Sequence, residues 1–327
     1  MERSAVRCSS RAHRVKHWSV RDIVNSIDVS AINCNAGFST QRRGLDAFLE
    51  ELVHYSTRMP IPSRIALPVC YLLLQIGVLK AATLAGRAAN AGETLDLNFP
   101  VPKYFQDYAA QGGNPHPTTG RLLLMFPPGF DPNRPWPILI VTSTTDGHRT
   151  SPMDAPWYRA AAMSEGWIVL ASDAIIRPRE DSTVWRVALL GAALDLLHRE
   201  WPQSAKWPVA FAGLSGGAKQ SGWMGAMLSA SGTVKIRGFF LTGINDDRLS
   251  AACKTYPPTS DFLQVPIWIS SGQNDSIARP QAQEMVRASL EHTGFRRVHL
   301  SHFLGGHELD QPDLRRALKW FRELGRF

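Results

Sequence analysis

From residue 95 to the end of the chain, short apolar runs of strand length alternate with longer segments of helical periodicity. The run at 137–142 (PILIVT) is rich in β-branched residues, which is typical of a strand buried on both faces of a parallel sheet. The segment 182–199 instead spaces its apolar residues by three and four, which predicts an amphipathic helix. By the same criteria, strands are expected at 121–126, 167–172, 209–212, 236–241, 265–270 and 297–302, and helices at 153–164, 217–230, 280–292 and 312–324.

This alternation predicts an α/β domain built on a mostly parallel central sheet with helices on both faces. The segment 92–327 is long enough for one large domain of this kind. No internal repeat or low-complexity tract interrupts it, and no long insertion follows the later strands. We therefore expect one catalytic-type domain over 92–327 without a large cap domain above the sheet.

The first 58 residues show a different pattern. They are rich in arginine and serine, and only 44–55 has the periodicity of an amphipathic helix. A helix of about three turns is marginally stable by itself. Residues 1–58 are therefore predicted to be a basic, disordered extension.

Residues 59–91 have the layout of a secretory signal peptide. Met59 and Arg64 precede an apolar run at 65–79, and small residues follow at 89–91. The run is short for a membrane span, which needs about 20 apolar residues. Our hypothesis is that translation starts at Met59 and that the mature chain, exported to the periplasm or secreted, begins at Gly92 without a stable membrane span. The alternative is a cytoplasmic protein in which the apolar run forms a buried helix.

The positive charge of the chain is concentrated in residues 1–91. The net charge is +8, of which +6 belongs to residues 1–91 and +2 to residues 92–327. A basic groove for DNA or RNA is therefore not expected in the domain, and only the N-terminal tail could bind nucleic acid electrostatically. Cys253 is the one cysteine beyond residue 92, and no spacing typical of a zinc site occurs. We expect Cys253 to be a buried thiol and no metal to be bound.

The segment 213–217 reads Gly-Leu-Ser-Gly-Gly, which matches the pattern Gly-x-Ser-x-Gly. It lies between the strand expected at 209–212 and the helix expected at 217–230. A sharp turn between strand and helix exposes a serine hydroxyl above the sheet, and flanking glycines avoid clashes there. The helix N-terminus also favours negative charge that develops near it. The sequence therefore predicts Ser215 as a nucleophile.

A serine nucleophile needs a base and an acid that orients the base. Asp275 and His307 each follow an expected strand, where open α/β sheets place their sites, and they occur in the order serine, acid, histidine. They are the predicted acid and base. Asp246 or Asp247 stays open as an alternative acid. His302 stays open as an alternative base, although its position within a strand indicates a packing role. Asp173 precedes Ser215 in the chain and is expected to be a strand-end cap or pocket residue.

The developing oxyanion needs two backbone N–H donors. Gly216, directly after the nucleophile, is expected to supply one, and the loop after 137–142 the other, with Thr144 favoured and Thr145 close behind. Thr145, Trp157 and Lys219 are the candidates for substrate contact, Trp157 because it follows this loop by about a dozen residues. A solvated or capping role is the favoured interpretation for Lys219, and a packing role for Trp157. Trp185 and Trp223 are expected to be packing residues.

The elbow GLSGG, the acid segment SGQND and the histidine segment GGHEL, in this order, resemble the α/β-hydrolase family. Within that family the chain is similar to the compact serine esterases related to dienelactone hydrolases and polyhydroxybutyrate-depolymerase-like enzymes. The loop TSTTDGH departs from the His-Gly motif that many of these enzymes carry.

The resemblance implies hydrolysis of a small-molecule or polymer-borne ester through an acyl-enzyme, without metal or cofactor. Two alternatives stay open: a serine peptidase or amidase with the same triad, and a non-catalytic binding protein that keeps the fold.

Overall fold

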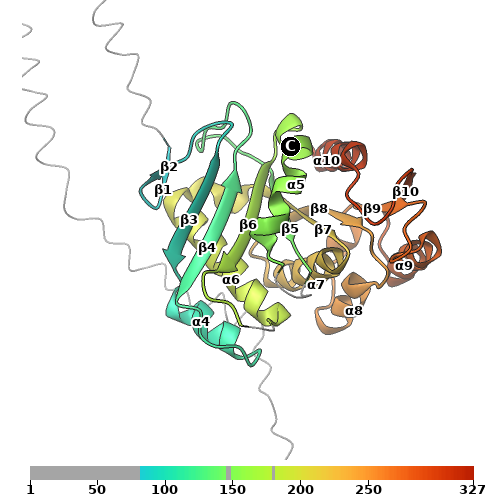
Figure 1. The fold of residues 1–327 in the computed structure, drawn as a ribbon, viewed down its shortest axis with the longest axis horizontal. Coiled ribbons are helices and arrows are strands. Elements are labelled where there is room, and N and C mark those ends of the chain that lie inside the picture. Colours follow the sequence, from blue (N-terminus) through green and yellow to red (C-terminus); the bar gives the residue numbers. More distant parts are fainter. Residues whose placement is uncertain (1–81, 145–148, 179–180) are drawn as a thin grey trace, which may run out of the picture. The chain divides into compact units, whose positions relative to one another are not determined.

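The computed structural model describes residues 82–144, 149–178 and 181–327, and in them the chain forms an eight-stranded sheet (Figure 1). The strand order is β10-β9-β8-β7-β5-β6-β4-β3, with parallel pairing from β10 to β6 and antiparallel pairing of β4 with both β6 and β3. The strands span Thr94–Pro100 (β3), Thr119–Met125 (β4), Ile138–Thr142 (β5), Ile168–Ala174 (β6), Pro208–Leu214 (β7), Lys235–Thr242 (β8), Ile267–Gly272 (β9) and Val298–Phe303 (β10).

Helices cover both faces of this sheet (Figure 1). On one face α5 (Ser151–Ser164) and α10 (Gln311–Gly325) bury a core with Tyr158, Trp167 and Phe321. The other core holds Trp185, Phe211 and Phe239. Its helices are α4 (Lys103–Ala110), α6 (Thr183–Glu200), α7 (Gly216–Ser231), α8 (Arg248–Thr255) and α9 (Pro280–Thr293).

Every strand and helix expected between residues 121 and 324 is present, with bounds shifted by a few residues. The mostly parallel α/β architecture is confirmed. Strand β3 and helices α4 and α8 were not expected. Strand β3 alternates exposed and buried residues, and each of the two helices has eight residues, so their apolar signals are short. Helix α6 differs from the one-sided helix expected: it is buried around most of its circumference, including Arg186.

A small hairpin, β1 (Thr83–Leu84) with β2 (Arg87–Ala88), precedes the sheet and packs on it. Leu84 is fully buried in the core, and the indole Nε1 of Trp201 donates to the Thr83 carbonyl at 3.0 Å. The folded domain therefore includes residues 82–91. The sequence analysis assigned these residues to the end of the predicted signal peptide, so the predicted domain boundary at residue 92 lies inside the fold. Residues 1–81 lie outside the described residues. They include the basic extension 1–58, with the helix expected at 44–55, and the rest of the predicted signal peptide. Signal-peptide processing itself stays a prediction.

In the part of the chain that the structure describes, no helix combines the length and hydrophobicity needed to cross a membrane.

The burial of Leu84 leads to a stability prediction for the full-length chain. Leu84→Ala should lower the free energy of unfolding by about 3 kcal/mol, because it deletes buried methyl groups and leaves a cavity. Urea denaturation measures the change. The control is Leu304→Ala, since that leucine is 87% exposed and its loss should cost less than about 0.5 kcal/mol. Equal stability of Leu84→Ala and the wild type would contradict the packing of the hairpin.

Candidate active site

The turn between β7 and α7 holds Ser215 in a strained backbone conformation. Its φ of 58° and ψ of −121° lie in a backbone region that residues other than glycine rarely adopt. The neighbouring glycines permit the turn: a Cβ on Gly213 would lie 2.2 Å from the Gly217 carbonyl carbon, and one on Gly217 would lie 2.3 Å from the Thr142 oxygen. The sequence therefore places Ser215 at the N-terminus of α7, at the carboxyl end of the sheet, as predicted.

Asp275 and His307 follow β9 and β10, and the structure brings them together. His307 Nδ1 lies 2.8 Å from Asp275 Oδ2, and the aspartate is almost fully buried. Asp275 Oδ1 accepts the backbone N–H groups of Ile277 at 2.8 Å and Ala278 at 2.7 Å. Because a carboxylate oxygen accepts, Nδ1 carries the proton and donates it. The acid is thus fixed on one side by backbone and orients the imidazole on the other.

The imidazole of His307 lies beside the serine turn. A Cβ on Gly243 would lie 2.9 Å from His307 Cε1 and 3.1 Å from Leu214 Cδ1, so the ring packs against the chain at the end of β8. The preceding residue, Thr242, accepts the backbone N–H of Ser215 at 2.9 Å. Nε2, the ring nitrogen that Asp275 does not contact, is therefore the atom left for a proton of the nucleophile.

The alternative acids and base have other partners. Asp246 Oδ2 pairs with Arg248 Nε at 2.7 Å, and Asp247 accepts the N–H of Ser250 at 2.9 Å as the N-cap of α8. His302 lies on the edge strand β10 with 40% of its side chain exposed, rather than in the packing expected for it. Asp173 caps its strand end through the N–H of Ala174, as expected for it. The structure therefore pairs only Asp275 with His307 among these candidates.

Thr144, at the end of β5, faces the serine turn. A Cβ on Gly216 would lie 2.3 Å from Thr144 Oγ1, so the two backbones approach each other closely beside Ser215. The two residues predicted to supply the oxyanion donors are therefore neighbours beside Ser215. Thr145 falls outside the described residues.

A cavity of about 450 Å³ opens at these residues. Lys219, one helical turn beyond Ser215, lines it, although a solvated or capping role was the favoured interpretation for this residue. Trp157 does not: it lies under the guanidinium of Arg149, 4.4 Å from its ring centre, and is absent from the cavity wall. The described residues that line the cavity are Thr144, Thr183, Ser215, Gly216, Lys219, Gln220, Trp223 and Arg248.

Four of these lining residues were missed or misassigned from the sequence. Trp223 lines the cavity although it was expected in packing, whereas Trp185 is in the core as expected. Trp223 follows Gln220 by three residues and Lys219 by four, so the three share a face of α7, which helical spacing from Lys219 could have indicated. Thr183 and Arg248 come from other elements and had no signal of this kind.

The loop that carries Thr144 is held by Arg186, a buried arginine of α6. Arg186 Nη1 donates to the Ser143 carbonyl at 2.6 Å, and Nη2 donates to the Thr144 carbonyl at 2.9 Å. Its Nε donates to Asp181 Oδ2 at 3.0 Å. One side chain thus connects two consecutive carbonyls of the loop to a carboxylate that precedes the helix.

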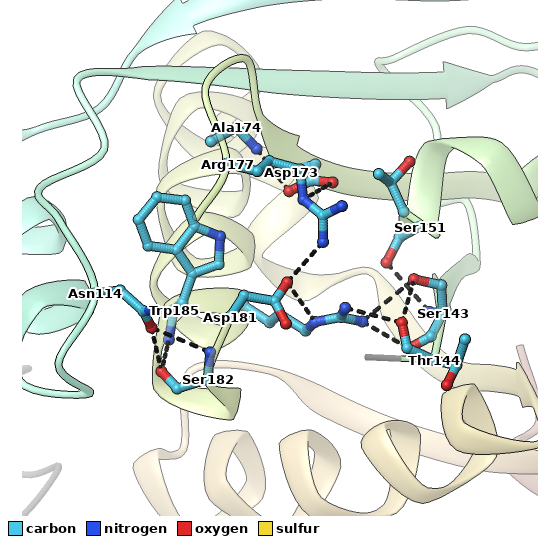
Figure 2. Close-up of polar contacts among 12 residues, drawn as sticks. Asn114, Ser143, Thr144, Ser151, Asp173, Ala174, Arg177, Asp181, Ser182 and Trp185 are labelled. Carbon is cyan, nitrogen blue, oxygen red and sulfur yellow. Dashed lines mark hydrogen bonds and ion pairs between the residues drawn. The ribbon is translucent and has the colours of Figure 1, made fainter. Parts of the chain in front are cut away.

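A second arginine extends this network. Arg177 Nη2 donates to the same Asp181 oxygen at 2.7 Å, and Arg177 Nε lies 3.0 Å from Asp173 Oδ2 (Figure 2). Burial raises the pKa of the Asp173 carboxyl above its usual range, while Arg177 opposes the shift. The four side chains alternate in charge, which compensates their loss of hydration.

Within the described ranges, no three histidine, cysteine or acidic side chains come together in a way that could hold a metal ion. Cys253 is buried, as predicted, and burial raises the pKa of its thiol to about 11.

No family model and no curated protein matches the sequence. Solved structures match it at low identity. A ferulic acid esterase is 12% identical with a TM-score of 0.52, and the match covers 72% of this chain and 100% of that one. An esterase of Pyrobaculum calidifontis is 13% identical (TM-score 0.49; 89% and 99% covered), as is a fluorophosphonate-binding serine hydrolase of Staphylococcus aureus (TM-score 0.47; 71% and 99% covered). At these identities the likeness concerns the fold: the chain has the α/β-hydrolase fold.

Proposed function

We propose that this protein is a serine hydrolase that cleaves carboxylic esters, with Ser215 as nucleophile, His307 as base and Asp275 as the acid that orients it. The observation that carries the proposal is the 2.8 Å contact between His307 Nδ1 and Asp275 Oδ2 beside a strained serine turn. The esterase names of the structural neighbours agree with it.

In the proposed reaction, Ser215 Oγ attacks the ester carbonyl while His307 Nε2 accepts its proton. The N–H groups of Gly216 and Thr144 donate to the oxyanion, and the positive end of α7 adds to this stabilisation. The alcohol leaves with the proton from His307. Water, activated by the same nitrogen, then hydrolyses the acyl-serine. Every proton is carried by one histidine, and no cofactor takes part.

The substrate is proposed to be a small-molecule or polymer-borne ester, because the 450 Å³ cavity holds a small acyl or alcohol group. The compact esterase subtype related to dienelactone hydrolases and polyhydroxybutyrate depolymerases is part of the same proposal.

Labelling with a fluorophosphonate probe tests the proposal on the full chain. The wild type should be modified once, at Ser215, and Ser215→Ala should not react, as read by intact-protein mass. An unlabelled wild type would support a non-catalytic protein with this fold. Comparing p-nitrophenyl acetate with the matched p-nitroacetanilide separates an esterase from an amidase: faster cleavage of the anilide would overturn the ester assignment.

A further inference from the structure

The cavity beside Ser215 is lined mostly by groups that donate hydrogen bonds. Lys219 and Arg248 contribute cationic side chains, and no carboxylate is among its described lining residues. Gln220 Oε1 already accepts from Thr183 Oγ1 at 3.1 Å, so the amide nitrogen is the group of Gln220 left for a ligand. A cavity with this lining favours a ligand that presents acceptors or negative charge.

The two cations differ in how far they are neutralised. Arg248 Nε pairs with Asp246 Oδ2 at 2.7 Å, with both side chains about half exposed. For Lys219, none of the ion pairs among the described residues involves its ammonium group. Lys219 is partly buried, and its ammonium has no counter-charge among the described residues, so they do not compensate its loss of hydration. A bound carboxylate would supply that counter-charge.

We infer that the substrate is an ester that carries a carboxylate, bound by Lys219 with help from Arg248. This inference rests on the proposed esterase function and names its substrate class. Lys219 lies four residues after Ser215, a rise of about 6 Å along the helix. Because Lys219 and Ser215 line the same cavity, one ester can reach both, as would a half-ester of a short dicarboxylic acid.

Two pairs of esters test this inference by placing the charge on either side of the scissile bond. The first is p-nitrophenyl hemiglutarate and its neutral methyl ester; the second is 4-acetoxybenzoate and its methyl ester. In at least one pair, wild-type kcat/KM should favour the anion at least tenfold. Lys219→Met should bring that ratio close to one, and Lys219→Arg should retain most of it.

The control is Lys206→Met, which removes an exposed cation remote from the cavity wall and should leave the ratio unchanged. Raising the ionic strength should weaken the wild-type preference by screening. A wild type that prefers the neutral ester in both pairs, or a Lys219→Met ratio equal to that of the wild type, overturns the inference. Hydrolysis of the neutral esters would still uphold the esterase; absence of any hydrolysis would count against the esterase itself.

A second inference comes independently from the contacts of Arg186. A trans peptide directs its N–H away from its C=O, so a Ser143 carbonyl held by Arg186 turns the Thr144 N–H to the opposite side. Thr144 itself approaches Gly216 closely beside the serine turn. The geometry points to Arg186 as a positioning residue for the proposed oxyanion site.

The guanidinium shape explains why arginine stands there. Its planar fork reaches two neighbouring carbonyls and the Asp181 carboxylate at once, whereas a lysine ammonium is a single point charge without this geometry. The side chain is about 9% exposed and touches no lining residue other than Thr144 in these contacts. It therefore acts on the loop and not on the substrate.

Arg186→Met should lower kcat by 10²–10³ per active site, the usual effect of losing one oxyanion donor, with KM within about threefold. Active sites are counted by fluorophosphonate titration, so a fraction of unfolded protein does not enter the rate. Inhibition by a trifluoromethyl ketone, which binds as a tetrahedral adduct, should weaken in proportion to kcat.

Arg186→Lys keeps the charge and should fall between Met and the wild type, which keeps the test valid if the Met variant does not fold. A rate per titrated site within threefold of the wild type in both variants overturns the positioning role. A lower melting temperature with an unchanged rate would show a purely structural role.

Discussion

Ser215→Ala is expected to lower kcat/KM for p-nitrophenyl acetate by at least 10⁴, the largest effect of any single substitution in this chain. Removing the hydroxyl abolishes the acyl-enzyme, so only stabilisation by the oxyanion donors and substrate binding remains. The loss should lie in kcat, and a pre-steady-state burst of p-nitrophenol seen in the wild type should disappear. Continuous absorbance assays at enzyme concentrations spanning four decades measure both effects.

The control for this substitution is Ser231→Ala at the other end of α7, where the hydroxyl bonds to the Leu228 carbonyl and to Thr233. That variant should keep its activity within twofold. The melting temperature of Ser215→Ala should be equal to or above that of the wild type, because alanine removes a polar group from a strained turn without changing its packing. A Ser215→Ala variant that retains more than a hundredth of the wild-type activity would contradict the role of Ser215.

Asp275→Asn should lower kcat by 10³–10⁴, the second-largest effect, through the tautomer of His307. The backbone donors Ile277 and Ala278 hold one side-chain oxygen, so the new amide oxygen takes that position. The amide nitrogen then faces His307 Nδ1 and donates to it. Nδ1 becomes an acceptor, the ring proton moves to Nε2, and Nε2 no longer accepts the serine proton.

Two variants make the Asp275→Asn result specific. Asp247→Asn replaces the runner-up acid with another good N-cap residue for α8, so activity should remain within threefold. Asp275→Ala removes the tautomer lock without imposing the wrong tautomer, and should be less impaired than Asp275→Asn. Equal rates for Asp275→Asn and the wild type would show that another group orients the histidine.

The succession of strands and helices along the chain could be predicted, and the three proposed catalytic side chains could be selected as candidates, because their signals are local. An apolar run with β-branched residues identifies each buried strand, and Gly213 with Gly217 marks the sharp turn around Ser215. Asp275 and His307 were found from their positions directly after strands. These features depend on short segments and on the general rule that sites form at the carboxyl end of a parallel sheet.

The parts that could not be predicted depend on contacts between distant segments. Arg186 lies 43 residues from Ser143, and nothing in the helix pattern distinguishes it from a solvated arginine. The choice of Trp157 over Trp223 failed because it used distance from the loop along the chain, whereas the wall of the cavity is set by the direction of α7. Leu84 lies in a stretch of small residues, and the neighbouring Thr83 carbonyl is held by Trp201, 118 residues later in the chain.

The three glycines around Ser215 also determine where the proposed active site can be re-engineered. Side chains at 213, 216 or 217 would collide with neighbouring atoms at 2.2–2.3 Å, so a mutant library covering these positions would consist mostly of inactive members. The first position on α7 whose side chain reaches the cavity is Lys219. Mutagenesis of residues 219, 220, 223 and 248 would change the lining of the cavity while leaving Ser215 and the turn that holds it unchanged.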